Sequence, residues 1–335
     1  MHIVLITPAP PGSMAGNRAT AQRWAGLLEH EGHSVTIVTD FTGEYLQRHQ
    51  GKHCDLVIAL HAWRSHDAVA QVREALPHTP LIVVLTGTDI YHHQHHFPET
   101  TLETMDWADC LIGLHHRVVG DVPARYGRKL VTVLQSADQP LAPVPRNPDC
   151  FQVCVIGHLR DEKDSLRAAL AAKLLPGNSR VEVINAGKPH TPEWEARARE
   201  EQAANPRFQW VGEIGKQEIQ ALMKRSHLMV ISSIMEGGAN VVSEACRAGL
   251  PILASDISGN IGLLGDDYPG YFKTGDERDL ARLLSKAESS AEFVAELTHK
   301  VIERAVDFTP EAEQAALAAA IKMALAQRAA LSRSE

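Results

Sequence analysis

The chain has 335 residues, and its 33 Lys and Arg against 41 Asp and Glu give a formal net charge of −8. This length predicts two domains of roughly 150 residues each. The acidic balance, without a long basic run, argues against nucleic acid as a partner. No stretch of about 18 apolar residues occurs, and no basic segment precedes the short apolar run at the N-terminus. We therefore expect a soluble, cytoplasmic protein with no membrane partner. The five scattered cysteines suit reduced, buried thiols.

The first half of the chain alternates short apolar runs with amphipathic segments. The runs predict strands at His2–Thr7, Ser34–Thr39, Cys54–Leu60, Pro80–Leu85, Cys110–Leu114 and Leu130–Leu134. A helix with Thr20, Trp24, Leu27 and Leu28 on one face follows the first strand, and further helices are predicted at Ser65–Leu76 and Thr101–Trp107. Because the strands are apolar on both faces, they predict a parallel sheet covered by helices.

Four prolines within Gln139–Pro148 predict the domain linker, since neither a helix nor a central strand tolerates them. The pattern then restarts with predicted strands at Phe151–Ile156, Arg180–Ala186, Arg207–Gly212, His227–Ser233 and Pro251–Ser255. The predicted helices between and after them are Asp164–Leu175, Glu193–Ala204, Lys216–Arg225 and Ala239–Ala248. A last Ala-rich helix, Pro310–Leu331, is about 30 Å long, enough to return to the first domain. We predict an N-terminal domain over 1–139, a second over 149–309 and this helix within 310–335.

The segment from Ser233 to Ser255 contains the strongest indication of a ligand site. Glu236 ends a strand, and Gly237 and Gly238 bring backbone N–H groups close to a ligand at the positive end of the next helix. Such a turn binds diphosphate. Glu244, just over one turn into the helix, can accept hydrogen bonds from the vicinal hydroxyls of a ribose. The alternative is a generic glycine-rich turn with two surface carboxylates.

This segment resembles the retaining GT-B glycosyltransferases, whose second domain carries Glu-x7-Glu, a small-residue helix and a Gly-x-Pro strand. Glu236, Glu244 and the run Ala248–Leu253 match that pattern. The resemblance implies an α/β fold of the GT-B type, with two Rossmann-like domains whose parallel sheets face a central cleft. It also implies that Glu236 contacts the donor sugar and that Glu244 holds the ribose. The backbone that binds sugar and phosphate is then that of Gly237, Gly238, Ala239 and Asn240.

A second match, to the family's Gly-Arg-Leu-x3-Lys, follows the first strand of the second domain. Lys163 matches the lysine that holds the diphosphate, but His158 stands where the family has arginine. Arg160 is predicted to supply the missing guanidinium, because a leaving UDP needs charge compensation. A solvated surface charge is the alternative. By the same resemblance, the loop with Gly212 and Ile214 holds the uracil through its backbone.

Two places in the first domain are predicted to hold the second substrate. The loop after the first strand offers amides and one cation for a phosphate-bearing substrate, from Gly16, Asn17 and Arg18. His61, and the turn with Thr88 and Asp89, end the third and fourth strands, where ligands bind in open α/β sheets. Plain turns are the alternative at both places.

The segment His92–His96 is rich in histidine, which is a common metal ligand, but no clear carboxylate pair accompanies it. No Asp-x-Asp follows a strand either. We therefore expect a solvated or acceptor-side loop here, no metal site and no required cofactor.

Beyond the donor motif, nearly the whole chain resembles the selenosugar synthases of selenoneine biosynthesis. The strings that carry this resemblance are TPAPPGS, LTGTD, GHLRDEKD, MEGGANVVSEA and the run Ser258–Phe272. Members join selenophosphate to the anomeric carbon of a UDP-sugar such as UDP-N-acetylglucosamine, forming a carbon–selenium bond and releasing UDP and phosphate. The resemblance implies small-molecule substrates and leaves a homodimer open. An ordinary retaining oxygen glycosyltransferase with a small-molecule or lipid acceptor, and a non-catalytic nucleotide-sugar binding protein, are the alternatives.

Overall fold

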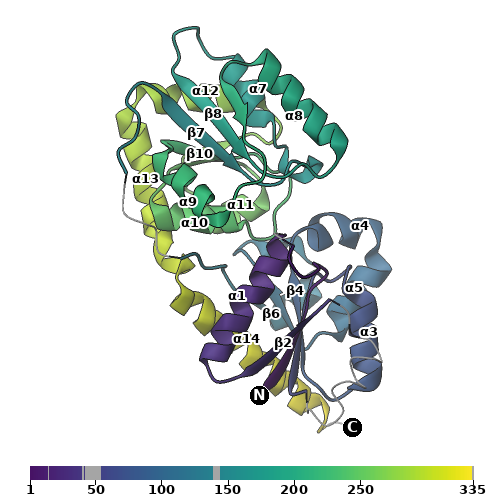
Figure 1. Cartoon of the computed structure of the whole chain (residues 1–335). Coiled ribbons are helices and arrows are strands. Elements are labelled where there is room, and N and C mark those ends of the chain that lie inside the picture. Colours follow the sequence, from purple (N-terminus) through teal and green to yellow (C-terminus); the bar gives the residue numbers. More distant parts are fainter. Residues whose placement is uncertain (14, 40, 42–53, 139–143, 334–335) are drawn as a thin grey trace. The chain divides into compact units, whose positions relative to one another are not determined.

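The computed structural model describes residues 1–13, 15–39, 41, 54–138 and 144–333 (Figure 1). The chain divides into two compact units: unit 1 is Met1–Gln135 with Pro310–Glu335, and unit 2 is Ser136–Thr309. Residues 139–143 of the predicted linker lie outside the described part. Each unit is built on one parallel six-stranded sheet, as the alternation of apolar runs and helices predicts.

The sheet of unit 1 has the order β2-β1-β3-β4-β5-β6. Its strands are β1 His2–Ile6, β2 Ser34–Val38, β3 Leu56–Leu60, β4 Leu81–Leu85, β5 Cys110–Gly113 and β6 Leu130–Thr132. Every residue of β3, β4 and β5 is buried, because helices cover both faces. The strand order reverses between β1 and β3, and ligands bind in such sheets at the carboxyl ends of the strands beside this reversal.

Two layers of helices cover this sheet. One face packs against α1 (Gly16–His30) and α14 (Pro310–Leu331), and the other against α3 (His66–Ala75) and α5 (Pro98–Trp107). The remaining short helical elements of unit 1 are η1 Asp89–His93, α4 Gln94–His96, α6 Val118–Asp121 and η2 Ala124–Lys129. In α1 the buried side chains include Thr20, Trp24 and Leu28, as the helical period predicts.

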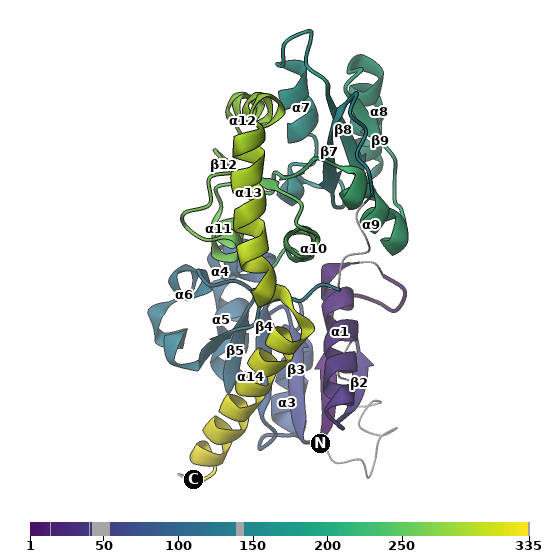
Figure 2. The same cartoon turned by 90° about the vertical axis from the view of Figure 1, so that its left-hand side faces the viewer.

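Helix α14 packs against α1 and the strands β4, β5 and β6 of unit 1 (Figure 2). Its buried apolar face consists of Leu317, Ala320, Ile321 and Ala324. Near its N-terminal end, the buried carboxylate of Glu313 accepts hydrogen bonds from Trp24 Nε1 at 2.7 Å and from Arg23 Nε at 2.9 Å. This end of the helix is therefore held by a paired buried charge as well as by apolar packing.

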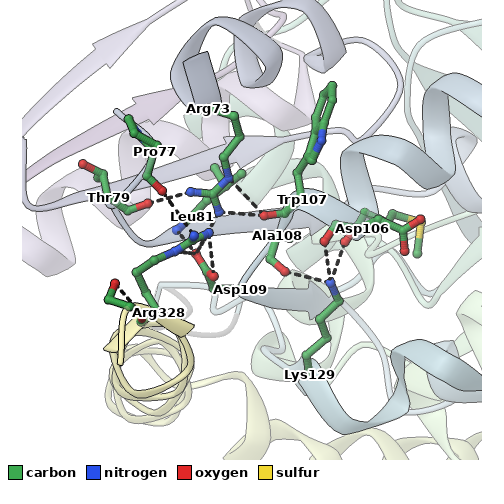
Figure 3. Close-up of polar contacts among 12 residues, drawn as sticks. Arg73, Pro77, Thr79, Leu81, Asp106, Trp107, Ala108, Asp109, Lys129 and Arg328 are labelled. Atoms are coloured by element: carbon green, nitrogen blue, oxygen red, sulfur yellow. Dashed lines mark hydrogen bonds and ion pairs between the residues drawn. The ribbon is translucent and has the colours of Figure 1, made fainter. Parts of the chain in front are cut away.

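A second buried carboxylate holds the other end of α14. Asp109, just before β5, faces Arg328 of α14, with Nη2 2.8 Å from Oδ1 (Figure 3). The same carboxylate binds Arg73 of α3, with Nη2 2.8 Å from Oδ2, and accepts the Leu81 N–H at 2.8 Å. The Asp109 side chain is only 2% exposed, so these three donors replace its water. A single carboxylate thus joins α3, β4 and α14.

The sheet of unit 2 has the order β12-β11-β10-β7-β8-β9. Its strands are β7 Phe151–Ile156, β8 Val181–Ala186, β9 Phe208–Trp210, β10 Leu228–Ile231, β11 Ile252–Ser255 and β12 Tyr271–Phe272. In chain order this is the strand order of a doubly wound dinucleotide-binding sheet, with its reversal between β7 and β10. The loops after β7 and β10 therefore lie at the expected ligand-binding edge, and these loops carry the two sequence motifs.

Helices cover both faces of this sheet as well. They are α7 Arg167–Lys173, α8 Pro192–Ala204, α9 Lys216–Arg225, α10 Asn240–Ala248, α11 Ser258–Leu264, α12 Glu277–Ser289 and α13 Ala291–Arg304, with the short turns η3 Asp161–Lys163 and η4 Ala305–Phe308. The elements from α11 to η4 have no counterpart among the predicted ones. Within the described residues, no helix combines the length and the apolarity needed to cross a bilayer.

The predicted helix Asp164–Leu175 is wrong at its start. Asp164 has φ 44°, in the left-handed region, so η3 ends there and α7 begins only at Arg167. A residue in this conformation ends a right-handed helix. The turn is held by a tertiary contact, because the Ser232 hydroxyl donates to the carbonyl oxygens of Lys163 and Asp164 at 3.2 and 2.9 Å.

Candidate active site

The loops that follow β7 and β10 are bonded to each other at the switch point of the unit 2 sheet. The Ile234 N–H donates to the Glu162 carbonyl at 2.9 Å, and Ser232 reaches across as described above. Two motifs that are far apart in the sequence therefore lie side by side in the structure. The topology explains this, because both loops follow strands that flank the reversal of strand order.

Lys163 and Glu236 form an ion pair between these loops, through Nζ and Oε1. The Ser233 hydroxyl donates to the same carboxylate oxygen at 2.5 Å. The Glu236 side chain is 8% exposed and the Lys163 side chain 20%, so the pair is largely withdrawn from water yet reachable from one side. The structure thus brings together two of the predicted catalytic residues. Ser233 was missed, although it lies inside the motif, three residues before Glu236.

The predicted donor-binding backbone leads directly into α10. Gly237 is buried, Gly238 is half-buried, and the helix begins at Asn240. Ala239 is the N-cap and has no side chain that could cap the helix. A positive helix end without a side-chain cap is an arrangement that binds anions. Glu244 lies half-buried one turn further along the same helix.

Arg160 stands at the start of η3, and its carbonyl accepts the Lys163 N–H at 3.2 Å. Its Nε lies 3.8 Å from Glu162 Oε2. Burial, followed by the positive charge of Arg160, lowers the pKa of His158, while Glu213 acts in the opposite direction. His158 is therefore a neutral imidazole at neutral pH and does not replace the charge of the arginine that the family pattern has there. The cations of this loop are Arg160 and Lys163.

Glycines bring the ends of β7, β8 and β9 together. A Cβ on Gly187 would lie 1.8 Å from the Gly157 carbonyl oxygen, so no other residue fits at position 187. The Gly187 N–H donates to the Gly212 carbonyl at 2.8 Å, and Gly212 has φ +74°, which favours glycine. Ile214 lies half-buried just before α9. Gly187 was not predicted, although its place directly after a predicted strand was a signal.

In unit 1, His61 and Thr88 meet at the carboxyl ends of β3 and β4. The Arg64 N–H donates to His61 Nδ1 at 3.1 Å, so the ring proton is on Nε2, which donates to Thr88 Oγ1 at 2.9 Å. Burial lowers the pKa of His61 to about 4, which keeps the ring neutral. His61 also has φ 75°, uncommon for a residue other than glycine, and such strain concentrates at functional sites.

Asp89 was predicted to bind the acceptor, but the structure gives its carboxylate a different task. The side chain is fully buried. It accepts backbone N–H bonds from Ala62 at 3.1 Å, Gly87 at 2.7 Å and Ile90 at 3.1 Å, and from Thr86 as well. With its oxygens committed, Asp89 holds the loops after β3 and β4 in place rather than facing a ligand.

The expectation of a loop at His92–His96 is wrong, because this run is helical in η1 and α4. The cause is Asp89, which holds the start of η1 by accepting N–H bonds in that turn. His93 is buried, donates from Nδ1 to the Thr88 carbonyl at 2.7 Å and stacks on Trp63 with 4.2 Å between ring centroids. Within the described ranges, no three His, Cys, Asp or Glu side chains form a group that could hold a metal ion.

The other predicted acceptor residues lie at the N-terminal end of α1. Gly16 is exposed and is the first helical residue, and Asn17 is half-buried. The N-cap, Ala15, has no side-chain cap. Arg18 Nε is buried and has no hydrogen-bond partner among the described residues. Backbone amides and one cation are therefore gathered here, beside the reversal of the unit 1 sheet.

A family model described as glycosyl transferases group 1 matches residues 138–308, more than half of the chain. The chain belongs to this family. The matched region contains both glycosyl transferase motifs, with Lys163, Glu236 and Glu244.

Three solved structures resemble the chain over nearly its whole length. HepE from Anabaena in complex with UDP is 16% identical, with a TM-score of 0.75, and the match covers 96% of this chain and 100% of that one. Sucrose-phosphate synthase from Thermosynechococcus elongatus is 16% identical, with a TM-score of 0.79 and coverage of 97% and 99%. A glycosyltransferase from Rickettsia africae is 14% identical, with a TM-score of 0.70 and coverage of 96% and 98%. These likenesses confirm the predicted α/β fold of the GT-B type.

Proposed function

We propose that this glycosyltransferase is a selenosugar synthase, which transfers the sugar of a UDP-sugar resembling UDP-N-acetylglucosamine to selenophosphate in selenoneine biosynthesis. The observation that carries the proposal is the Lys163–Glu236 pair at the switch point of unit 2, next to the N-terminal end of α10. Selenium as the attacking atom rests on the resemblance of nearly the whole chain to the selenosugar synthases.

On the donor side, a diphosphate competes with Glu236 for Lys163. When the ammonium moves to the phosphate oxygens, the carboxylate of Glu236 becomes available to the hydroxyls of the sugar, and Ser233 keeps it in place. Arg160 adds a second cation, and Glu244 accepts hydrogen bonds from the ribose. The choice of UDP is supported by HepE, which was solved in complex with UDP and with UDP-glucose.

On the acceptor side, the amides and Arg18 at the start of α1 suit a small anion. The selenium of selenophosphate attacks the anomeric carbon, and the bond from that carbon to the UDP oxygen breaks with its electron pair leaving on UDP. Water then cleaves the selenium–phosphorus bond, giving phosphate and the selenosugar. An anionic, polarisable nucleophile needs less help from a general base than a hydroxyl does. Retention at the anomeric carbon follows from the resemblance, and the proposal requires no cofactor.

The proposal is tested by incubating the protein with selenophosphate and a panel of UDP-sugars, with mass detection of the products. We expect UDP, phosphate and a seleno-product to appear together for one preferred sugar. Transfer only to hydroxyl acceptors would identify an ordinary oxygen glycosyltransferase. Binding of UDP-sugars without release of UDP to any acceptor would identify a binding protein. Either of these results contradicts the proposal.

Replacing Arg18 with alanine is expected to raise the apparent KM for selenophosphate at least about tenfold, because a charged hydrogen bond to an anion is worth roughly 1.5–3 kcal/mol. The KM for the UDP-sugar should stay within about twofold, since the guanidinium pairs with the acceptor anion. Steady-state kinetics with each substrate varied in turn measures both values. Arg199→Ala, an exposed arginine of α8, is the control. A selenophosphate KM within about twofold of wild type would show that this loop is an ordinary turn. The acceptor-binding site would then be assigned to His61 and Thr88.

A further inference from the structure

The start of α11 approaches the backbone of Glu236 so closely that only glycine fits there. A Cβ on Gly259 would lie 2.2 Å from the Glu236 carbonyl oxygen and 3.0 Å from its Cβ. Gly259 is helical and fully buried, a setting in which alanine is usually preferred by about 1 kcal/mol. Contact with Glu236, rather than helix propensity, therefore accounts for the glycine.

The next residue starts a chain of buried polar contacts that ends on the Glu236 carboxylate. Asn260 Nδ2 donates to both the carbonyl and the hydroxyl oxygen of Ser255 at 3.0 Å. The Ser255 hydroxyl donates to the Ser233 carbonyl at 2.5 Å, and the Ser233 hydroxyl donates to Glu236 Oε1 at 2.5 Å. Asn260, Ser255 and Ser233 are at most 1% exposed. In so dry an environment each of these bonds is costly to lose, so the chain resists displacement.

We infer that Gly259 and Asn260 are positioning residues for Glu236. Gly259 sets the distance between α11 and the Glu236 backbone, and Asn260 holds Ser255, which in turn holds Ser233 against the Glu236 carboxylate. This inference rests on the proposed function, in which Glu236 binds hydroxyls of the donor sugar. Neither residue has to touch the donor. A disturbance of α11 should therefore impair recognition of the sugar more than binding of the diphosphate, which depends on Lys163 and the end of α10.

The experiment compares Gly259→Ala and Asn260→Asp with the wild type. Asn260→Asp keeps the size of the side chain but places a carboxylate oxygen against the Ser255 carbonyl. We expect kcat/KM for the UDP-sugar to fall at least about 30-fold in both, while the Kd of UDP alone, measured by calorimetry, changes less than about threefold. Gly177→Ala is the control, because a Cβ there meets nothing within 4 Å. Equal losses for UDP and the UDP-sugar would show a general structural role and overturn the inference.

A gentler variant keeps the inference testable if these two fold poorly. Ser255→Ala removes the hydroxyl that donates to Ser233 and adds no atom. A crystal structure of Ser255→Ala is expected to show the Glu236 carboxylate displaced from Ser233 and Lys163. An undisturbed Glu236 in this variant would overturn the inference. The position of the Glu236 carboxylate can be measured whether or not the protein transfers sugar. A wild type that transfers no sugar would therefore refute the proposed function and leave this test in place.

Discussion

Replacing Glu236 with alanine is expected to lower kcat for sugar transfer at least ~10²-fold, while the Kd of UDP alone stays within about threefold. The carboxylate stands at the switch point of unit 2, is 8% exposed and already accepts a hydrogen bond from Ser233. In the proposed function, its removal takes away the group that binds hydroxyls of the donor sugar. Steady-state kinetics at saturating donor, with calorimetry for UDP, measures the two quantities.

Lys163→Ala is the informative comparison, because the proposed function assigns the diphosphate to Lys163 and the donor sugar to its partner Glu236. This variant is expected to weaken the binding of both UDP and the UDP-sugar, since in the proposed function the ammonium pairs with the diphosphate that they share. Glu200→Ala, which removes an exposed carboxylate from α8, should change neither kcat nor UDP affinity. Near wild-type turnover of Glu236→Ala at saturating donor would remove Glu236 from the active site.

Replacing Asp109 with asparagine is expected to destabilise unit 1 by about 3–5 kcal/mol, the usual cost of breaking a buried ion pair on one side. The substitution keeps the size of the side chain but leaves the guanidinium groups of Arg73 and Arg328 without their shared negative charge. Burial lowers the pKa of Arg73, and the hydrogen bond and charge of Asp109 act in the opposite direction. The melting temperature of unit 1 should fall by roughly 10 °C in a calorimetric scan.

The matched control lies three residues earlier in the chain. Asp106 pairs with Arg125 at 3.4 Å, but both side chains are more than half exposed. Asp106→Asn should therefore change the free energy of unfolding by no more than about 0.5 kcal/mol. Equal melting temperatures for the two variants would show that Asp109 contributes no more to the stability of unit 1 than the exposed Asp106 does.

Much of the fold could be predicted because its signals are local. Buried parallel strands appear in the sequence as short apolar runs, and the helices between them show the helical period, so both sheets were predicted except for β12. Helix α14 was predicted with its observed bounds because Ala-rich composition acts residue by residue. The break at Asp164 was not predicted, because it depends on the Ser232 hydroxyl from another loop. The helical turn at His92–His96 likewise depends on the neighbouring Asp89.

The sequence by itself determined which residue types are available for donor chemistry, since Lys163, Glu236 and Glu244 stand in recognisable motifs. It also determined the alternation that builds two parallel sheets. Only the tertiary structure decided that Lys163 pairs with Glu236, that Asp89 is committed to backbone N–H groups, and that a glycine of α11 sets the place of Glu236. The physical reason is that these contacts join loops following different strands. Their geometry depends on sheet order and on the close packing of neighbouring loops, which no local pattern of residues encodes.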